Sequence, residues 1–261
     1  MLDVRYLELL ESKVDFYNRP DFIESDPIFI PHQFTKLQDI EIAGLIAAVF
    51  AWGQRKTIVS KALDFLARMD NSPYDFILNH SGKDLLAFNN FKHRTFNSID
   101  ALNFIHFFRF HYSQENSLET AFYRESACFK DSKVWMTSAL IEFRRYFASS
   151  IEVKSRTLKH VASPLSNSTC KRLNMFLRWM IRKDNRGVDF GLWSKFSPSQ
   201  LLCPLDVHVN RVSRKIGLLK REQNDFKSVL QLSENLKLLD PKDPVKYDFA
   251  LFSLGIKEGF A

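Results

Sequence analysis

The apolar residues of this chain recur mostly at the three- and four-residue spacing of amphipathic helices, and strict alternation of apolar and polar residues is scarce. The pattern predicts helices over residues 2–16, 55–69, 99–111, 118–124, 133–147, 169–183, 207–216, 225–239 and 245–254. The stretch IEIAGLIAAVFAW (residues 40–52) is apolar on all sides, which is typical of a buried helix and suits a floor between two lobes. We expect an all-α protein of about ten helices.

No repeat, low-complexity tract or obvious linker divides the sequence, so residues 1–261 are expected to form a single all-α unit of two lobes. Glycine is rare, with 8 copies, which disfavours loop-rich and all-β folds, and the 25 Phe residues should dominate the core. No apolar run approaches the roughly 20 residues that span a bilayer. The mixed charges of MLDVRYLELLESK are unlike a signal peptide, so we expect a cytoplasmic protein that does not enter a membrane.

Cysteine usage argues against a metal or cofactor site. Cys128, Cys170 and Cys203 are far apart and form no C-x-x-C pair. This spacing disfavours a disulfide framework, a zinc knuckle and a four-cysteine iron–sulfur cluster. We therefore expect neither a cofactor nor a bound metal.

The positive charge is concentrated in one segment. The net charge is +7, yet residues 154–186 alone carry +8, because nine basic residues there face only Asp184. The basic residues are Lys154, Arg156, Lys159, Lys171, Arg172, Arg178, Arg182, Lys183 and Arg186. Such a local excess favours binding of a polyanion such as nucleic acid, although a solvated basic face is the alternative.

The helix predicted over residues 169–183 carries most of this charge. At about 100° per residue, Lys171, Asn174, Arg178 and Arg182 fall on one stripe, opposite an apolar stripe that faces the core. This geometry predicts an exposed row of cations. Lys171 lies in the first turn, where a helix N-terminus disfavours a protonated amine, so it is a candidate nucleophile; the alternative is a solvated phosphate contact.

One carboxylate stands out at the start of another basic helix. In CPLDVHVNRVSRKIGL (residues 203–218), Asp206 follows a Pro-Leu step and directly precedes the predicted helix. Asp is a good N-cap, worth about 1 kcal/mol, and that explanation suffices for its position. It is also the residue type that stabilises a cation in a reaction.

The same segment carries a resemblance. PLDVHVNRVSRKIGL resembles the segment after the hairpin in helix-hairpin-helix base-excision DNA glycosylases, with the pattern D-x-H-x-x-R-x-x-x-x-x-G-L. Asp206, His208, Arg211, Gly217 and Leu218 match it. Lys171 resembles the lysine early in the second hairpin helix of members with lyase activity, and its separation of 35 residues from Asp206 is similar to that of the archaeal 8-oxoguanine glycosylase branch.

The resemblance extends to the C-terminus. DPVKYDFALFSLG (residues 243–255) resembles the family's final helix, which packs over the site, and residues 150–221 resemble its hairpin and catalytic-Asp segment. The whole chain is also similar to an uncharacterised bacterial family placed near these enzymes. Two features differ: HVASPLSNSTCK lacks the usual hairpin glycines, and the four-cysteine cluster of some members is absent.

The resemblance implies a two-lobed DNA glycosylase with AP-lyase activity on an oxidised purine such as 8-oxoguanine, in which Lys171 is the nucleophile and Asp206 stabilises the cationic sugar. Asp184 and Asp189 are the rival acids. Gln54 resembles the family's base-reading residue, and Trp52, Trp179 and Trp193 are candidates to stack on the base, or else core residues. The residues expected to contact nucleic acid are Arg172, Arg178, Arg182, His208, Arg211 and Arg214.

The expected partner is duplex DNA with a damaged base, and the protein is expected to be a monomer. Two other interpretations stay open. One is a non-catalytic nucleic-acid-binding protein on the same scaffold, which the missing hairpin glycines favour, and the other is a protein that acts on RNA. The Lys171/Asp206 pair favours the enzyme.

Overall fold

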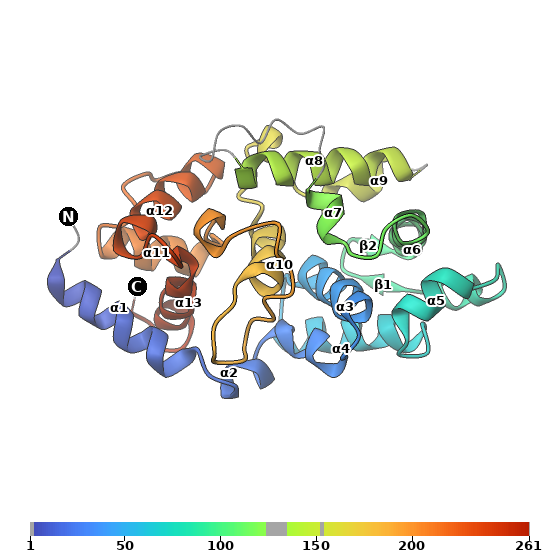
Figure 1. The fold of residues 1–261 in the computed structure, drawn as a ribbon, viewed down its shortest axis with the longest axis horizontal. Helices are drawn as coiled ribbons and strands as arrows, with labels where there is room; N and C mark the ends of the chain where they lie inside the picture. Colours follow the sequence, from blue (N-terminus) through green and yellow to red (C-terminus); the bar gives the residue numbers. More distant parts are fainter. Residues whose placement is uncertain (1–2, 124–134, 152–153, 261) are drawn as a thin grey trace. The chain divides into compact units, whose positions relative to one another are not determined.

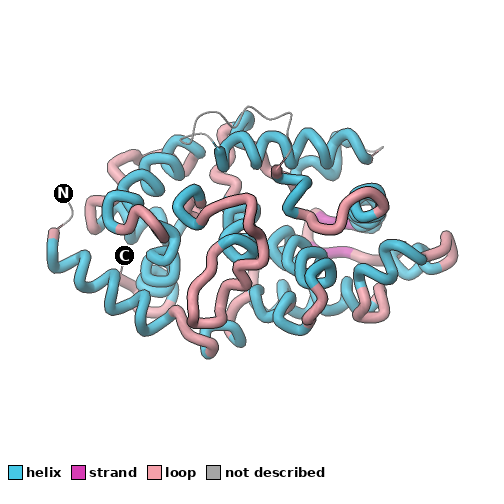
Figure 2. The backbone as a smooth tube through the Cα atoms, viewed as in Figure 1, coloured by secondary structure: helices cyan, strands magenta, loops and turns pink. Residues whose placement is uncertain are grey.

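A computed structural model of the chain describes residues 3–123, 135–151 and 154–260. Most of these residues are helical, and the strands are confined to one short hairpin, which confirms the all-α prediction (Figure 1). The described part of the chain holds no helix that combines the length and apolar character needed to cross a bilayer. The loops between the helices are drawn in Figure 2.

The chain divides into two compact units. One, which we call the terminal unit, contains the described residues of 3–25, 135–137 and 163–260. The other, which we call the inner unit, contains those of 26–123, 138–151 and 154–162. Each unit is described separately below.

Six α-helices lie in the terminal unit. They are α1 (Val4–Tyr17), α2 (Asp21–Glu24), α10 (Lys171–Ile181), α11 (Val207–Lys215), α12 (Phe226–Leu239) and α13 (Tyr247–Ile256). Three 3₁₀ turns accompany them, η5 (Pro164–Ser166), η6 (Pro198–Gln200) and η7 (Pro244–Lys246), each beginning with proline, whose fixed φ suits the first position of a helical turn. Helix α13 packs against both α1 and α11, as Figure 1 shows.

The inner unit is built around α3 (Leu37–Phe50). Every α3 residue from Ile40 to Phe50 is buried, which confirms the prediction from its all-round apolar sequence. The elements around it are η1 (Pro27–Phe29), η2 (Pro31–Gln33), α4 (Arg55–Ala67), α5 (Pro73–Asn79), η3 (Asp84–Phe88), α6 (Ser98–Tyr112), α7 (Glu119–Phe122), α9 (Lys154–Thr157), η4 (Leu158–His160) and, from residue 138 on, α8 (Trp135–Ser150). Phe50 contacts the rings of Phe65, Phe91 and Phe96, so aromatic packing does dominate this core.

The sequence pattern missed several short elements of the inner unit, among them helix α9. Helix α5 was not predicted, and neither was the antiparallel hairpin of β1 (Lys92–His93) and β2 (Phe96–Asn97), in which His93 pairs with Phe96. Strands of two residues are too short to show an alternating pattern. Arg124 and Lys133, the predicted end of one helix and start of another, and Cys128 lie outside the described residues.

Candidate active site

Two helix starts meet in the terminal unit. Helix α10 begins at Lys171 and α11 begins directly after Asp206, and the Nζ atom of Lys171 lies 3.2 Å from Oδ2 of Asp206. The two side chains are 30% and 12% exposed, so the pair is accessible from solvent without being fully hydrated. The structure therefore brings together the two residues that the sequence singled out, although 35 residues separate them.

Asp206 is both the N-cap of α11 and the partner of Lys171. Its Oδ1 accepts hydrogen bonds from the backbone N–H groups of His208 and Val209, each at 2.9 Å, and so caps α11. Its Oδ2 is the oxygen that faces Lys171. The cap fixes the carboxylate, and one oxygen stays directed at the amine, so the two roles are compatible.

The chain enters α10 through an unusual backbone. Asn167 and Cys170 both adopt left-handed conformations, with φ of 55° and 50°. Glycine adopts this conformation most easily, and Asn is the residue that tolerates it next best. The Ser168 hydroxyl accepts from the Cys170 N–H at 3.2 Å, and Asn167 donates from its side chain to Asp225 at 3.4 Å. The turn before Lys171 thus has glycine-like geometry without a glycine.

A buried acid, Asp248 of α13, lies near this pair. It is 5% exposed and forms an ion pair with Arg178 of α10. Burial raises the pKa of Asp248 to about 6 against the lowering effect of Arg178, and the negative charge of Asp206 adds to the rise. Asp248 was not among the predicted site residues. Its signal in the sequence is that it is the single acid in the apolar stretch YDFALFSLG, since a buried charge requires a partner.

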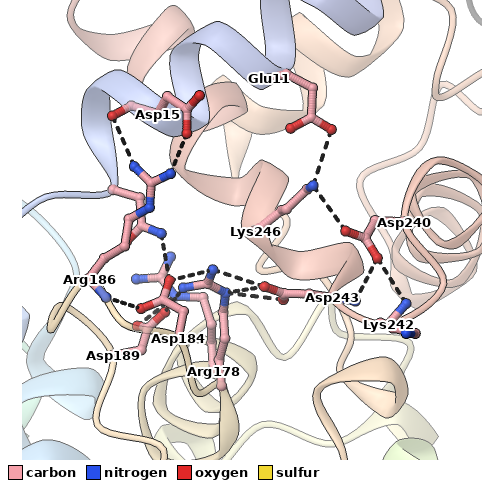
Figure 3. A network of polar contacts seen from close by, with 12 residues as sticks. Glu11, Asp15, Arg178, Asp184, Arg186, Asp189, Asp240, Lys242, Asp243 and Lys246 are labelled. Carbon is pink, nitrogen blue, oxygen red and sulfur yellow. Dashed lines mark hydrogen bonds and ion pairs between the residues drawn. The ribbon is translucent and has the colours of Figure 1, made fainter.

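Arg178 and Arg182 belong to a buried ionic network. Figure 3 labels Arg178 and three carboxylates of this network, those of Asp184, Asp189 and Asp243. Arg178 Nε donates to Asp189 at 3.2 Å, and Arg182 Nη1 donates to the other oxygen of Asp189 at 3.0 Å. Arg182 also pairs with Asp184 at 2.8 Å and with Asp243 at 2.9 Å. Burial acts against the charge of Arg182, yet Asp189 and Asp243 outweigh it and raise the pKa of the guanidinium.

This network corrects two expectations. Arg178 and Arg182 are 3% and 2% exposed, so the predicted surface row of cations does not exist at these positions. Helical periodicity correctly placed both arginines on one stripe of α10. Carboxylates that follow α10 in the sequence, those of Asp189, Asp243 and Asp248, cover that stripe. The rival acids Asp184 and Asp189 are both engaged by Arg182, and the carboxylate that faces Lys171 is that of Asp206.

Two of the three candidate stacking residues are core residues. Trp179 is fully buried in α10, and Trp193 is 3% exposed and packs edge-on against Phe176. Neither indole face is open to a ligand, which corrects their assignment to a base pocket. Trp52 is half-buried and Gln54 is exposed, and both belong to the inner unit.

The remaining predicted nucleic-acid contacts lie at or near the surface of the terminal unit. Arg211 and Arg214 are exposed on α11, and Arg214 lies 3.7 Å from Glu222. They line an open groove together with Asn210, Lys215, Gly217, Leu219 and Lys220. His208 is half-buried, and so is Arg172, whose pKa burial lowers to about 10. Within the described ranges, no group of three or more His, Cys, Asp or Glu side chains is arranged to hold a metal.

Residues 26–257 match the family described as "Protein of unknown function (DUF2400)". That match spans most of the sequence, and the chain belongs to this family. No curated protein and no solved structure matches the chain.

Proposed function

We propose that this protein is a cytoplasmic, monomeric DNA base-excision glycosylase with AP-lyase activity, acting on an oxidised purine such as 8-oxoguanine. The observation that carries the proposal is the 3.2 Å approach of the Lys171 amine to the Asp206 carboxylate at the starts of two helices. A nucleophilic amine beside an anion that can stabilise a cationic sugar is the pair that this chemistry needs. The choice of lesion and the two-lobed helix-hairpin-helix architecture rest on the sequence resemblance.

The proposed reaction begins with a damaged nucleotide flipped out of the duplex. The Lys171 Nζ bonds to C1′ of the sugar while the glycosidic bond breaks, and the departing base keeps the electron pair and takes up a proton. Nζ then loses one proton, the C1′–O4′ bond opens, and O4′ takes up a proton to become a hydroxyl, which leaves a protonated Schiff base. Loss of a C2′ proton then breaks the C3′–O bond and releases the 3′ phosphate.

Asp206 has two tasks in this scheme. In the proposed reaction, its Oδ2 stabilises the positive charge that develops on the sugar and accepts the proton that the amine must lose. The distance of 3.2 Å between Oδ2 and Nζ of Lys171 supports the second task. Because Oδ1 is held by two backbone N–H groups, the carboxylate needs little reorganisation during the reaction.

The turn before α10 supports the proposal in one further respect. The family resemblance implied a hairpin rich in glycine, and the absence of glycine favoured a non-catalytic binding protein. Asn167 and Cys170 adopt left-handed conformations there, which glycine would normally provide. The absence of glycine is therefore no argument against a catalytic protein.

Borohydride trapping tests the proposal. The protein is incubated with a duplex that carries 8-oxoguanine or an abasic site, and borohydride then reduces any Schiff base to a stable amine. We expect a covalent protein–DNA adduct that Lys171→Ala abolishes and Lys183→Ala retains, since Lys183 is an exposed lysine just past the end of the same helix. Salt-sensitive binding of DNA or RNA without an adduct on either duplex would instead identify a non-catalytic binding protein.

A further inference from the structure

The hairpin of the inner unit presents an arginine in a strained backbone conformation. Arg94 and Thr95 connect β1 to β2, and Arg94 has a φ of 55°, in the left-handed region that side chains rarely adopt. Strained residues of this kind persist where the surrounding structure fixes them, often at functional positions. The strain prompts the question of what the Arg94 side chain does.

The guanidinium of Arg94 lies on an aromatic surface. Its central carbon is 4.6 Å from the centroid of the Trp52 ring, within the range of a cation–π contact. The rings of Trp52 and His93 are perpendicular to each other, with centroids 6.0 Å apart. The indole is therefore held by the same hairpin that carries Arg94.

Gly53 keeps the space for this stack open. A Cβ atom at residue 53 would lie 2.4 Å from Nη1 of Arg94, so any side chain there would displace the guanidinium. Gly53 itself has a φ of 106°, which also favours glycine. The backbone conformation of Arg94 and the missing side chain at Gly53 thus both allow the Arg94 guanidinium to lie over the Trp52 ring.

Arg94 carries an unneutralised charge. Its side chain is exposed, and within the described ranges it makes neither a hydrogen bond nor an ion pair. Arg156, in the same unit, differs, because it lies 3.4 Å from Asp100 and donates to Asn97. The contact with the Trp52 ring uses none of the N–H groups as hydrogen-bond donors to a described residue, so these donors stay available.

We propose that Arg94, held on Trp52, is a receptor for a phosphodiester group of a nucleic acid strand. A planar guanidinium donates two parallel hydrogen bonds to a phosphate, and orientation on an indole lowers the entropy lost on binding. Lys92, on the first strand of the same hairpin, is also exposed and adds a second positive charge. The inference rests on the proposed function for its ligand, a nucleic acid, and it assigns Arg94 a role in binding the backbone rather than in the reaction.

The test measures binding of a short fluorescent duplex without a lesion, by anisotropy, across a range of salt concentrations. We expect Arg94→Ala to weaken binding several-fold at low salt and to lower the slope of log K against log salt by about one. Arg94→Lys should recover part of the affinity, since it keeps the charge but loses the planar fork. Trp52→Leu leaves every charge in place and should also weaken binding, provided that thermal melting shows a folded protein.

The matched control is Arg145→Ala. Arg145 is an exposed arginine of the inner unit that pairs with Glu142, and its removal changes the net charge by the same amount. The inference is overturned if Arg94→Ala binds as tightly as the wild type, or if Arg145→Ala weakens binding equally. Borohydride trapping separates this inference from the proposed function: an adduct without dependence of binding on Arg94 refutes only the former, and Arg94-dependent binding without an adduct refutes only the latter.

Discussion

The carboxylate of Asp206 divides its two oxygens between a helix and Lys171. One oxygen caps α11, and the other lies 3.2 Å from the Lys171 amine. The two functions can be separated by mutation, because Asn is as good an N-cap as Asp but carries no charge. The arrangement therefore offers a direct test of whether the acid has a chemical role besides a structural one.

We expect Asp206→Asn to lower the rate of adduct formation at least about a hundredfold, because the cationic sugar loses its counter-charge. Its free energy of unfolding should stay within about 0.5 kcal/mol of the wild type, since the cap remains. Asp206→Ala should lower the rate similarly and also cost about 1 kcal/mol of stability. Single-turnover trapping and urea denaturation measure the two quantities. Equal adduct rates in Asp206→Asn and wild type would leave Asp206 as a cap only.

Asp248 should make stability depend on pH. Burial raises its pKa to about 6 in the folded protein, from an ordinary value of 3.8. The folded state then binds more protons than the unfolded state between about pH 4 and 6, so this group's contribution to stability falls as the pH rises through that window. A pKa difference of two units between the folded and the unfolded state corresponds to a change of roughly 3 kcal/mol in the free energy of unfolding across this window.

Urea denaturation of wild type and Asp248→Asn at several pH values isolates this contribution. The wild type should lose stability relative to the variant as the pH rises from about 4 to 6, and the difference should be constant above about pH 7. A fixed offset is expected besides, because the variant alters the partner of Arg178. Parallel stability curves over the whole range would show that Asp248 titrates normally.

The buried Arg182 should stabilise the folded protein and should not contact nucleic acid. Replacing it with Met leaves three carboxylates, those of Asp184, Asp189 and Asp243, without their shared cation, and we expect a loss of about 3 to 5 kcal/mol. Arg145→Met, which removes an exposed arginine, should change the free energy of unfolding by less than about 1 kcal/mol. The measurement is again chemical denaturation. Similar stability of the two variants would contradict the structural role.

Gly255 should control the packing of α13 on α11. A Cβ atom there would lie 2.9 Å from Cβ of His208 and 3.2 Å from its backbone oxygen, so one helix must shift. Gly to Ala in a helix is normally stabilising, but here we expect a loss of about 1 to 3 kcal/mol.

Gly82→Ala is the matched control for this prediction. A Cβ atom at residue 82 would meet nothing within 4 Å, and the backbone there is not left-handed. That variant should be neutral or slightly stabilising. Because His208 lies in the first turn of α11, two residues after the N-cap Asp206, Gly255→Ala should also slow adduct formation, whereas Gly82→Ala should not. If Gly255→Ala is as stable as the wild type, the packing of α13 on α11 leaves room for a Cβ atom, and the prediction is wrong.

Local sequence patterns predicted most of the longer helices and the cap at Asp206. The burial of α3 and the cap at Asp206 follow from residues a few positions apart, because helical periodicity and N-capping are local interactions. Helix α10 begins at Lys171, two residues later than predicted, and its N-cap residue Cys170 makes no side-chain capping hydrogen bond. The pairing of Lys171 with Asp206 was predicted only from the family resemblance, since no local interaction brings together side chains 35 residues apart.

Which charged side chains are exposed depends on how distant segments pack together, and local patterns did not predict it. Periodicity put Arg178 and Arg182 on a polar stripe, but Asp189, Asp243 and Asp248 reach that stripe from later segments and bury it. The contact between Arg94 and Trp52 gave no signal in the sequence, because it depends on a turn with positive φ and on the absence of a side chain at residue 53. A charge pattern along a helix fixes the direction in which a side chain points, and the opposing segments fix whether solvent, a carboxylate or an aromatic ring meets it there.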